Sequence, residues 1–230
     1  MKKLMSFAAL TAFIFLINGC IPSIHPLYTK DKLVMVKELP GTWINGPADY
    51  NFSKKQKVMG EEKDVNITVY NNGEQPEIWK FEQLEDKEYR LIHTDSDGRR
   101  AAFEIFVIRL GKNYFIDFYP TDMPSEETEN GNNFSVLNNS MNSLQATHLF
   151  PVHTFAKLEV TQYQLKISMF DPDFLKKLLE NQQIRIKHEK TENGYVLTAS
   201  PQELQKFVEK YADVREAYLS GDPITLNKAK

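Results

Sequence analysis

Residues 100–119 constrain the fold most strongly, because they predict two adjacent strands that are apolar on both faces. Gly111-Lys112-Asn113 predicts a tight return between the strands 100–110 and 114–119. On the first strand, Phe103, Ile105 and Val107 alternate with Phe106, Ile108 and Leu110. Successive side chains of a strand point to opposite faces, so both faces need cover. We expect one face to line a barrel or sheet interior and the other to pack against a helix.

The flanking segments predict an antiparallel meander. Strands are expected at 77–83 and 87–94, followed by a turn at 95–98 in which Gly98 accepts positive φ. Further strands are expected at 149–160, 164–170, 184–190 and 195–199, the last two joined by an Asn-Gly hairpin turn. Residues 46–76 are polar and predict a long loop or an irregular hairpin, with one strand at 65–70.

Two helices are predicted after the meander. Asp171-Pro172 is an N-cap followed by a proline at the first helical position. Ser200 and Glu203 have the spacing of a capping box, and we expect the second helix to pack outside the 100–119 strand pair. The apolar stripes are Phe174, Leu175, Leu178 and Leu179 on the first helix, and Leu204, Phe207, Val208 and Tyr211 on the second, which Val214 and Tyr218 extend.

The N-terminus predicts export. Lys2 and Lys3 precede an apolar run over 7–17, and Gly19-Cys20 ends it, which is the order of a secretory signal. This stretch resembles a bacterial lipoprotein signal, with Asn18 in place of the usual Ala, Ser or Thr. The resemblance implies that Cys20 becomes the first mature residue and anchors the protein to a membrane through acyl chains. Ile21 is not the aspartate of an inner-membrane retention signal, so the outer membrane is favoured in a cell with two membranes.

Gly41-Thr42-Trp43, at the start of the first predicted strand, resembles the Gly-x-Trp signature of lipocalins and related calycin barrels. In that family the tryptophan closes one end of the barrel. We do not place the family's Thr-Asp-Tyr-like element or its distant arginine in this sequence. The predicted fold is mainly β, an antiparallel meander closing into a lipocalin-like barrel, or else an open sheet, with two α-helices packed outside.

The expected domain organisation has four parts. Residues 1–19 are the lipoprotein signal peptide, and residues 20–40, with three prolines in 21–40, are a lipidated tether. Residues 41–219 form a single β-rich domain that contains a polar loop at 121–145. Residues 220–230 are a flexible tail.

Composition excludes several classes of function. With 28 basic and 31 acidic residues, the chain lacks the basic excess that nucleic-acid binding requires. Cys20 is the only cysteine, so its acylation leaves no thiol for a disulfide, a metal or a nucleophile. The sequence has no phosphate-binding Gly-rich loop, Gly-x-Ser-x-Gly or His-Glu-x-x-His. We therefore predict no cofactor, and no catalytic residue is assigned.

Metal binding is weighed at two places. Asp95, Asp97, Gly98 and Glu104 partly match a calcium loop starting at His93, but a hairpin turn is preferred because the flanks are strand-like. His148 and His153 lie five residues apart, on opposite faces of an unbroken strand, and no third ligand is near in sequence. His188 is interpreted as a core-face histidine. We predict no metal site.

The candidate pocket or core is aromatic, with one buried charge. Asp117 shares a strand face with Phe115 and Tyr119, so an interior position would require a partner such as Arg109 or Lys157. The full set is Trp43, Trp79, Phe81, Tyr89, Phe103, Phe115, Asp117 and Tyr119.

Three hypotheses about function remain open. The protein is a lipid-anchored envelope protein that binds an apolar or peptide ligand in an interior void, or an assembly partner of other envelope proteins with a filled barrel and an exposed apolar patch. The third hypothesis, a hydrolase, requires His93, His148 or His153 to meet a carboxylate in a cleft.

Overall fold

The computed structural model describes residues 20–45, 51–58, 61–68, 76–121, 150–192, 194–219 and 223–229. The predicted signal peptide, His148 and all but the first residue of the predicted polar loop lie outside these residues. Among the described residues, no helix has the length and apolar character that a membrane crossing needs.

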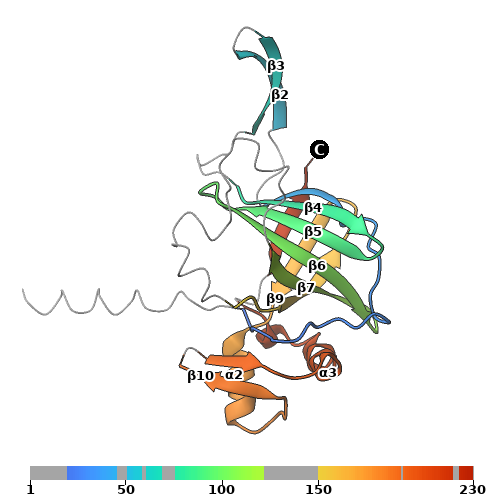
Figure 1. The fold of residues 1–230 in the computed structure, drawn as a ribbon, viewed down its shortest axis with the longest axis vertical. Coiled ribbons are helices and arrows are strands. Elements are labelled where there is room, and N and C mark those ends of the chain that lie inside the picture. The colour runs from blue at the N-terminus through green and yellow to red at the C-terminus, as the bar shows by residue number, and fades with distance from the viewer. Residues whose placement is uncertain are drawn as a thin grey trace, which may run out of the picture.

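A closed barrel of eight antiparallel strands forms the centre of the described structure (Figure 1). Each strand pairs with the next barrel strand along the chain, and the last strand returns to the first. This is the lipocalin-like barrel with two helices that the sequence predicted, so the open-sheet alternative is wrong. The barrel strands are β1 (Gly41–Asn45), β4 (Ile78–Glu85), β5 (Glu88–Thr94), β6 (Arg100–Leu110), β7 (Asn113–Thr121), β8 (Thr154–Val160), β9 (Gln164–Met169) and β12 (Ile224–Lys228).

Strand β12 corrects the prediction of a flexible tail. It lies between β9 and β1, where Leu226 pairs with both Leu165 and Asn45, so it is the strand that closes the barrel. Leu226 is fully buried in the barrel interior. The sequence signal was weak because Thr225, Asn227 and Lys228 are polar, and β12 offers few apolar residues of its own.

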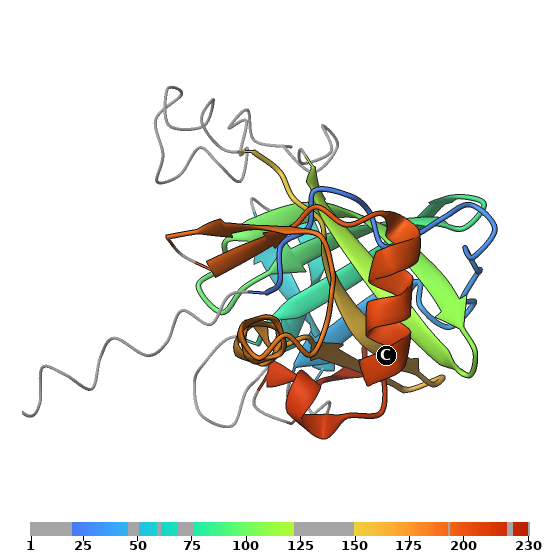
Figure 2. The ribbon, with the colours of Figure 1, turned by 90° about the horizontal axis from the view of Figure 1, so that it is seen from below.

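A second layer covers one side of the barrel (Figures 1 and 2). It contains helices α2 (Pro172–Glu180) and α3 (Pro201–Tyr211), a 3-10 turn, η2 (Arg215–Ala217), and the hairpin of β10 (His188–Thr191) and β11 (Gly194–Leu197). The predicted strand over 184–190 is therefore shorter than expected. The segment predicted as a long loop or an irregular hairpin contains a separate hairpin of β2 (Asn51–Val58) and β3 (Glu61–Thr68), and β3 begins and ends earlier than the strand expected at 65–70.

Both helices begin at the predicted caps. The Asp171 carboxylate accepts a hydrogen bond from the Asp173 amide at 2.7 Å. The Ser200 amide donates to Glu203 Oε2 at 2.9 Å, and the Ser200 hydroxyl accepts from the Glu203 amide, which completes the capping box. Helix α3 ends at Tyr211, so the predicted extension is wrong.

The alternation of side chains on β6 and β7 separates two hydrophobic cores. Ile105 and Val107 face the barrel interior, whereas Ile108 and Leu110 face outward to the second layer. On the outer side they belong to one cluster with Leu204, Phe207 and Val208 of α3, which confirms the expected position of that helix. The two-sided strand pair therefore has the cover on both faces that its composition requires.

The segment 20–40 is not a free tether but part of the folded domain. Ile21 and Leu27 are buried in the outer core, and Val36 and Leu39 in the barrel core. Figure 2 shows this segment crossing the covered side of the barrel near the β10–β11 hairpin and α3. The prolines favour irregular backbone, but the apolar residues between them pack as any core residues do.

Leu39 helps to position Trp43, the residue of the Gly-x-Trp signature. Trp43 is fully buried, and its indole N–H donates to the Leu39 carbonyl at 2.8 Å. Lys228 of β12 places its ammonium 4.9 Å from the centre of the Trp43 ring and donates to the Glu38 carbonyl at 3.0 Å. A lysine from the last strand thus covers the tryptophan of the first.

Candidate functional site

The predicted aromatic set divides between the two cores. Five of its members lie in or against the barrel-interior cluster, and these are Trp43, Trp79, Phe81, Tyr89 and Phe103. Phe115 instead packs in the outer core, and Asp117 and Tyr119 share its outward side of β7. The prediction that all eight residues form one pocket or core is wrong for these three, because Ile116 and Phe118 occupy the inward positions of that strand.

Two nitrogen atoms inside the barrel have no hydrogen-bond partner within the described part of the chain. They are Nε1 of Trp79 and Nε2 of His93, and both are shielded from solvent. The two residues face each other across β4 and β5, with ring centres 4.8 Å apart. Glu77 Oε2 lies 3.8 Å from His93 Nε2, beyond hydrogen-bonding distance. A ligand or water with an acceptor atom would satisfy the Trp79 N–H at this position.

Aromatic rings surround that polar position. Phe118 meets Trp79 edge-on with ring centres 6.4 Å apart, and it meets Phe103 in the same way at 6.3 Å. Trp79 and Phe103 are only partly buried, whereas Trp43 and Tyr89 are fully buried. The interior therefore combines aromatic side chains with an unpaired polar group, which suits an apolar ligand with one polar end.

A buried hydrogen bond between a carboxylate and a histidine lies on the outside of the barrel. Asp117 is 1% exposed, and its Oδ1 lies 2.8 Å from His153 Nδ1. Its Oδ2 accepts a hydrogen bond from the Leu27 amide at 2.6 Å. Burial raises the pKa of Asp117, while the His153 side chain and the Leu27 amide act in the opposite direction.

The partner of Asp117 is therefore neither of those the sequence suggested. Lys157 donates to the Ala212 carbonyl at 2.8 Å, and Arg109 Nε donates to the Gly111 carbonyl at 3.1 Å. From the sequence, His153 was a candidate only for a metal ligand or for a hydrolase residue. Its position beside Asp117 depends on pairing with Ser23, a residue 130 positions earlier, which local sequence does not encode.

The Asp117–His153 pair has a structural role in this geometry. His153 contacts a carboxylate, as the hydrolase hypothesis required, and its ring also packs against Tyr119 in a tilted arrangement with centres 4.5 Å apart. The hydroxyl of Ser23, the residue paired with His153, belongs to a buried side chain and donates to the His25 carbonyl at 2.7 Å. A nucleophile needs a base for its proton, and this serine is committed to a backbone acceptor instead.

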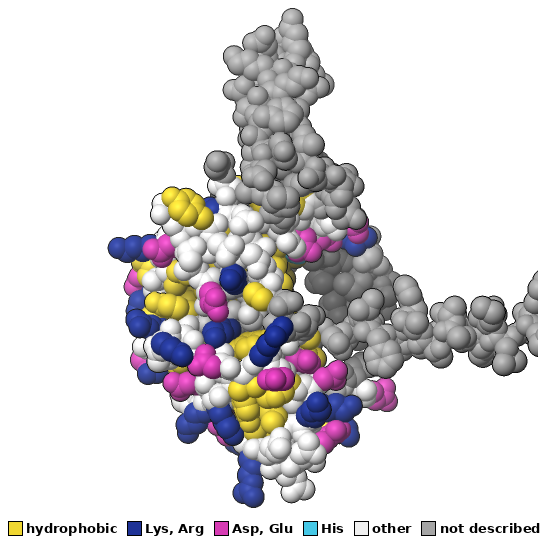
Figure 3. Space-filling model, turned by 180° about the vertical axis from the view of Figure 1, so that it is seen from behind, with side chains coloured by type: hydrophobic (Ala, Val, Ile, Leu, Met, Phe, Trp, Pro, Cys, Tyr) yellow, Lys and Arg dark blue, Asp and Glu magenta, His cyan; other side chains and the backbone are white. Residues whose placement is uncertain are grey.

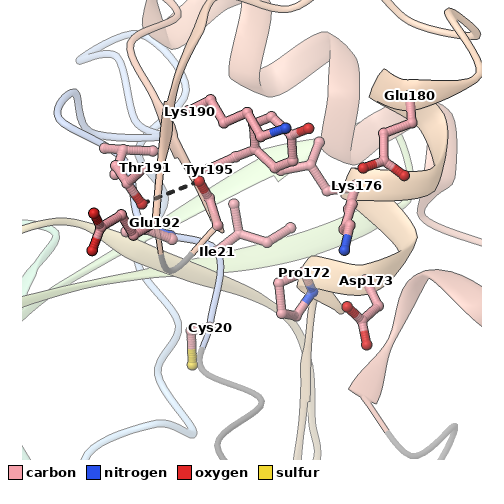
Figure 4. A pocket seen from close by; sticks show the side chains of 14 residues that line it. Cys20, Ile21, Pro172, Asp173, Lys176, Glu180, Lys190, Thr191, Glu192 and Tyr195 are labelled. Carbon is pink, nitrogen blue, oxygen red and sulfur yellow. Dashed lines mark hydrogen bonds between the residues drawn. The ribbon is translucent and has the colours of Figure 1, made fainter.

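A cavity of about 560 Å³ opens beside Cys20, between α2 and the β10–β11 hairpin (Figure 4). Ile21, Leu175 and Val196 supply apolar parts of its wall, and charged side chains stand around it. In Figure 4, Lys176 and Glu180 come from the helix and Lys190 and Glu192 from the hairpin. The volume is in the range of small-molecule sites, and the mixed wall suits an amphipathic or peptide ligand.

The thiol of Cys20 has the properties of a poor nucleophile. Burial raises the pKa of Cys20, so an unmodified side chain is protonated at neutral pH. Figure 4 shows its sulfur at the edge of the cavity, pointing away from the other labelled side chains. This position does not favour a nucleophilic role for the thiol at neutral pH. A group attached to the sulfur would extend away from the cavity.

The carboxylates of the turn at 95–98 bond to groups within the turn itself. Asp95 Oδ1 accepts from the amides of Asp97 and Arg99 at 3.0 and 2.8 Å, and Asp97 forms a 3.0 Å ion pair with Arg99. The turn is the hairpin turn that the sequence favoured over a calcium loop. Within the described part of the chain, no three His, Cys, Asp or Glu side chains are grouped so as to hold a metal.

Comparison with known protein-family models, with curated protein sequences and with solved structures gave no match to this chain.

Proposed function

We propose that this chain is a lipid-anchored protein of the bacterial cell envelope that binds an apolar or peptide ligand. The observation that carries the proposal is the position of Cys20, which ends the signal sequence, borders the cavity and precedes a core residue. Ile21 is 3% exposed, so the packed domain begins one residue after the predicted lipid attachment. In a cell with two membranes, the outer membrane is the proposed location.

Two places support a binding role. The cavity beside Cys20 has both apolar and charged walls, and the barrel interior holds a Trp79 N–H that has no partner among the described residues. The cavity is the stronger candidate because it has a defined volume and opens beside the anchor. A ligand there would lie within reach of the membrane to which the protein is attached.

The assembly hypothesis has weaker support. Among the described residues, the most exposed large apolar side chains are Phe150 and Tyr163, at 72% and 71%. They belong to different segments of the chain. Figure 3 shows small hydrophobic patches between acidic and basic side chains on one face, whereas an assembly surface would present a larger continuous patch.

Replacing Cys20 with serine tests the anchor. The Cys20→Ser variant should move from the membrane fraction to the soluble fraction, because acyl chains supply the proposed attachment. An Asn18→Ala variant keeps the cysteine and should remain with the membrane. The measurement is immunodetection after fractionation of cells, and a Cys20→Ser protein that stays in the membrane fraction would contradict the anchor.

Filling the cavity tests the binding role. We expect native mass spectrometry of the protein, purified without detergent, to show a co-purified ligand of discrete mass. Val196→Trp should remove that mass, because the larger side chain occupies the cavity wall, whereas Val152→Trp, outside the cavity, should retain it. A ligand-free spectrum for the natural sequence would contradict this part of the proposal.

A further inference from the structure

The backbone next to the proposed lipid is fixed to the domain within two residues of Cys20. The Leu197 amide donates to the Pro22 carbonyl at 2.9 Å, and the Ile24 amide donates to the Leu197 carbonyl at 2.9 Å. Ser23 and His153 exchange two backbone hydrogen bonds, each of 2.9 Å. The segment is thus held between β11 and the residue that precedes β8.

The anchor consequently has almost no spacer. In a mature chain that begins at Cys20, only Cys20 and Ile21 precede the first fixed backbone group. Ile21 is itself buried in the outer core. Two extended residues span at most about 7 Å. The headgroup region on each side of a bilayer is about 5–8 Å thick, so acyl chains on Cys20 can enter the hydrocarbon only if the surrounding surface approaches the headgroups.

We propose that the face formed by the first turns of α2 and the β10–β11 hairpin lies against the headgroups of the bilayer, which holds the domain in one orientation. This inference rests on the proposed acylation of Cys20. It assigns a membrane-contact surface to Asp173 and Lys176 of α2 and to Lys190, Thr191 and Glu192 of the hairpin. All five are exposed, and all border the cavity beside Cys20.

The charges of this face suit contact with zwitterionic headgroups. Lys176 and Lys190 can approach lipid phosphates, and Asp173 and Glu192 can approach lipid amines. Because both signs are present, the face lacks the basic cluster that draws proteins to anionic lipid. The covalent anchor, not surface charge, would set the orientation, and the orientation should therefore persist at high salt.

Fluorescence quenching by headgroup-attached nitroxide tests the orientation. The acylated protein is placed in phosphatidylcholine–phosphatidylethanolamine vesicles, and a fluorophore is attached to a single new cysteine, since acylation consumes the natural one. Lys190→Cys reports on the proposed contact face, and Asp86→Cys reports on the β4–β5 turn, on the opposite side of the barrel (Figure 1). A control inserts ten Gly and Ser residues between Cys20 and Ile21.

We expect the label at position 190 to be quenched at least threefold more than the label at position 86, with and without 0.5 M salt. The inserted spacer should bring the two values close together. Equal quenching of an acylated protein without the spacer would overturn the orientation and leave the anchor intact. Mass spectrometry that finds a free thiol at Cys20 would overturn both proposals.

Discussion

The barrel interior and the outer layer are held together by different means. The interior core consists mainly of strand residues with regular alternation, which Val36 and Leu39 of the segment 20–40 join, and the backbone groups of the strands pair within the barrel. The outer layer contains all three polar or charged residues that are buried in the described chain, Ser23, Asp117 and Gln205. Each of them lies in or bonds to the segment 20–40, which has little regular structure of its own.

The difference shows how an irregular segment gains a fixed position. A strand satisfies its amides with the next strand, but residues 22–29 need other partners. Asp117 accepts from the Leu27 amide, and Gln205 Nε2 donates to the Leu27 carbonyl at 3.0 Å and to Thr29 Oγ1 at 3.2 Å. Buried side chains on β7 and α3 therefore supply the bonds that a neighbouring strand supplies inside the barrel.

Leu91→Ala should have the largest effect, because it opens a cavity in the barrel interior. Leu91 is 1% exposed, and shortening a buried leucine to alanine costs about 2 to 5 kcal/mol of unfolding free energy. Chemical denaturation followed by fluorescence of the two tryptophans measures the loss. Since both cores share β6 and β7, we expect one cooperative unfolding transition. A separate unfolding transition of the outer layer would contradict this coupling of the two cores.

Asp117→Ala should have a smaller effect that is concentrated in the outer layer. It leaves the Leu27 amide buried without an acceptor, which costs about 1 to 3 kcal/mol. Limited proteolysis should detect the change as faster cleavage within residues 20–40, while the barrel fragment remains intact. Equal protection of that segment in the variant would contradict the role of Asp117.

Asp117→Asn is the matched control and should have the smallest effect. Its amide can accept from the Leu27 amide and donate to His153 Nδ1, so both hydrogen bonds are retained.

Because burial raises the pKa of Asp117 above its unfolded value, the folded state binds the proton more tightly. The contribution of Asp117 to stability is therefore present at low pH and lost as pH rises through the folded-state pKa. The asparagine variant should lack this dependence in denaturation measured across pH.

The sequence predicted the fold well where local pattern determines it. The two faces of β6, the cap at Asp171 and the capping box at Ser200 were all evident from spacing, and all occur in the structure. Strand β12 was not evident from the sequence, because its pairing with β1 and β9 is nonlocal and its composition is largely polar. Burial of residues 20–40 was not predicted, because the prolines indicated a tether, although Leu27 and Leu39 are core residues.

The site residues were predicted less well than the fold. Alternation placed Phe115 and Asp117 on one face of β7 but could not say which face was interior, and the His153 partner comes from a separate segment. The cavity beside Cys20 is built from residues 20–22 together with 172–180 and 190–196, which lie about 150 positions later in the sequence. Only Cys20 itself carried a local signal.

Hydrogen exchange of the N-terminal segment tests most directly whether that segment belongs to the fold and leaves the anchor without a spacer. The amides of Ser23, Ile24 and Leu27 all donate to buried acceptors. We predict that these three amides exchange at least a hundredfold more slowly than those of an unstructured peptide. Exchange at the rate of an unstructured chain would show that residues 20–40 are a free tether and would contradict the account.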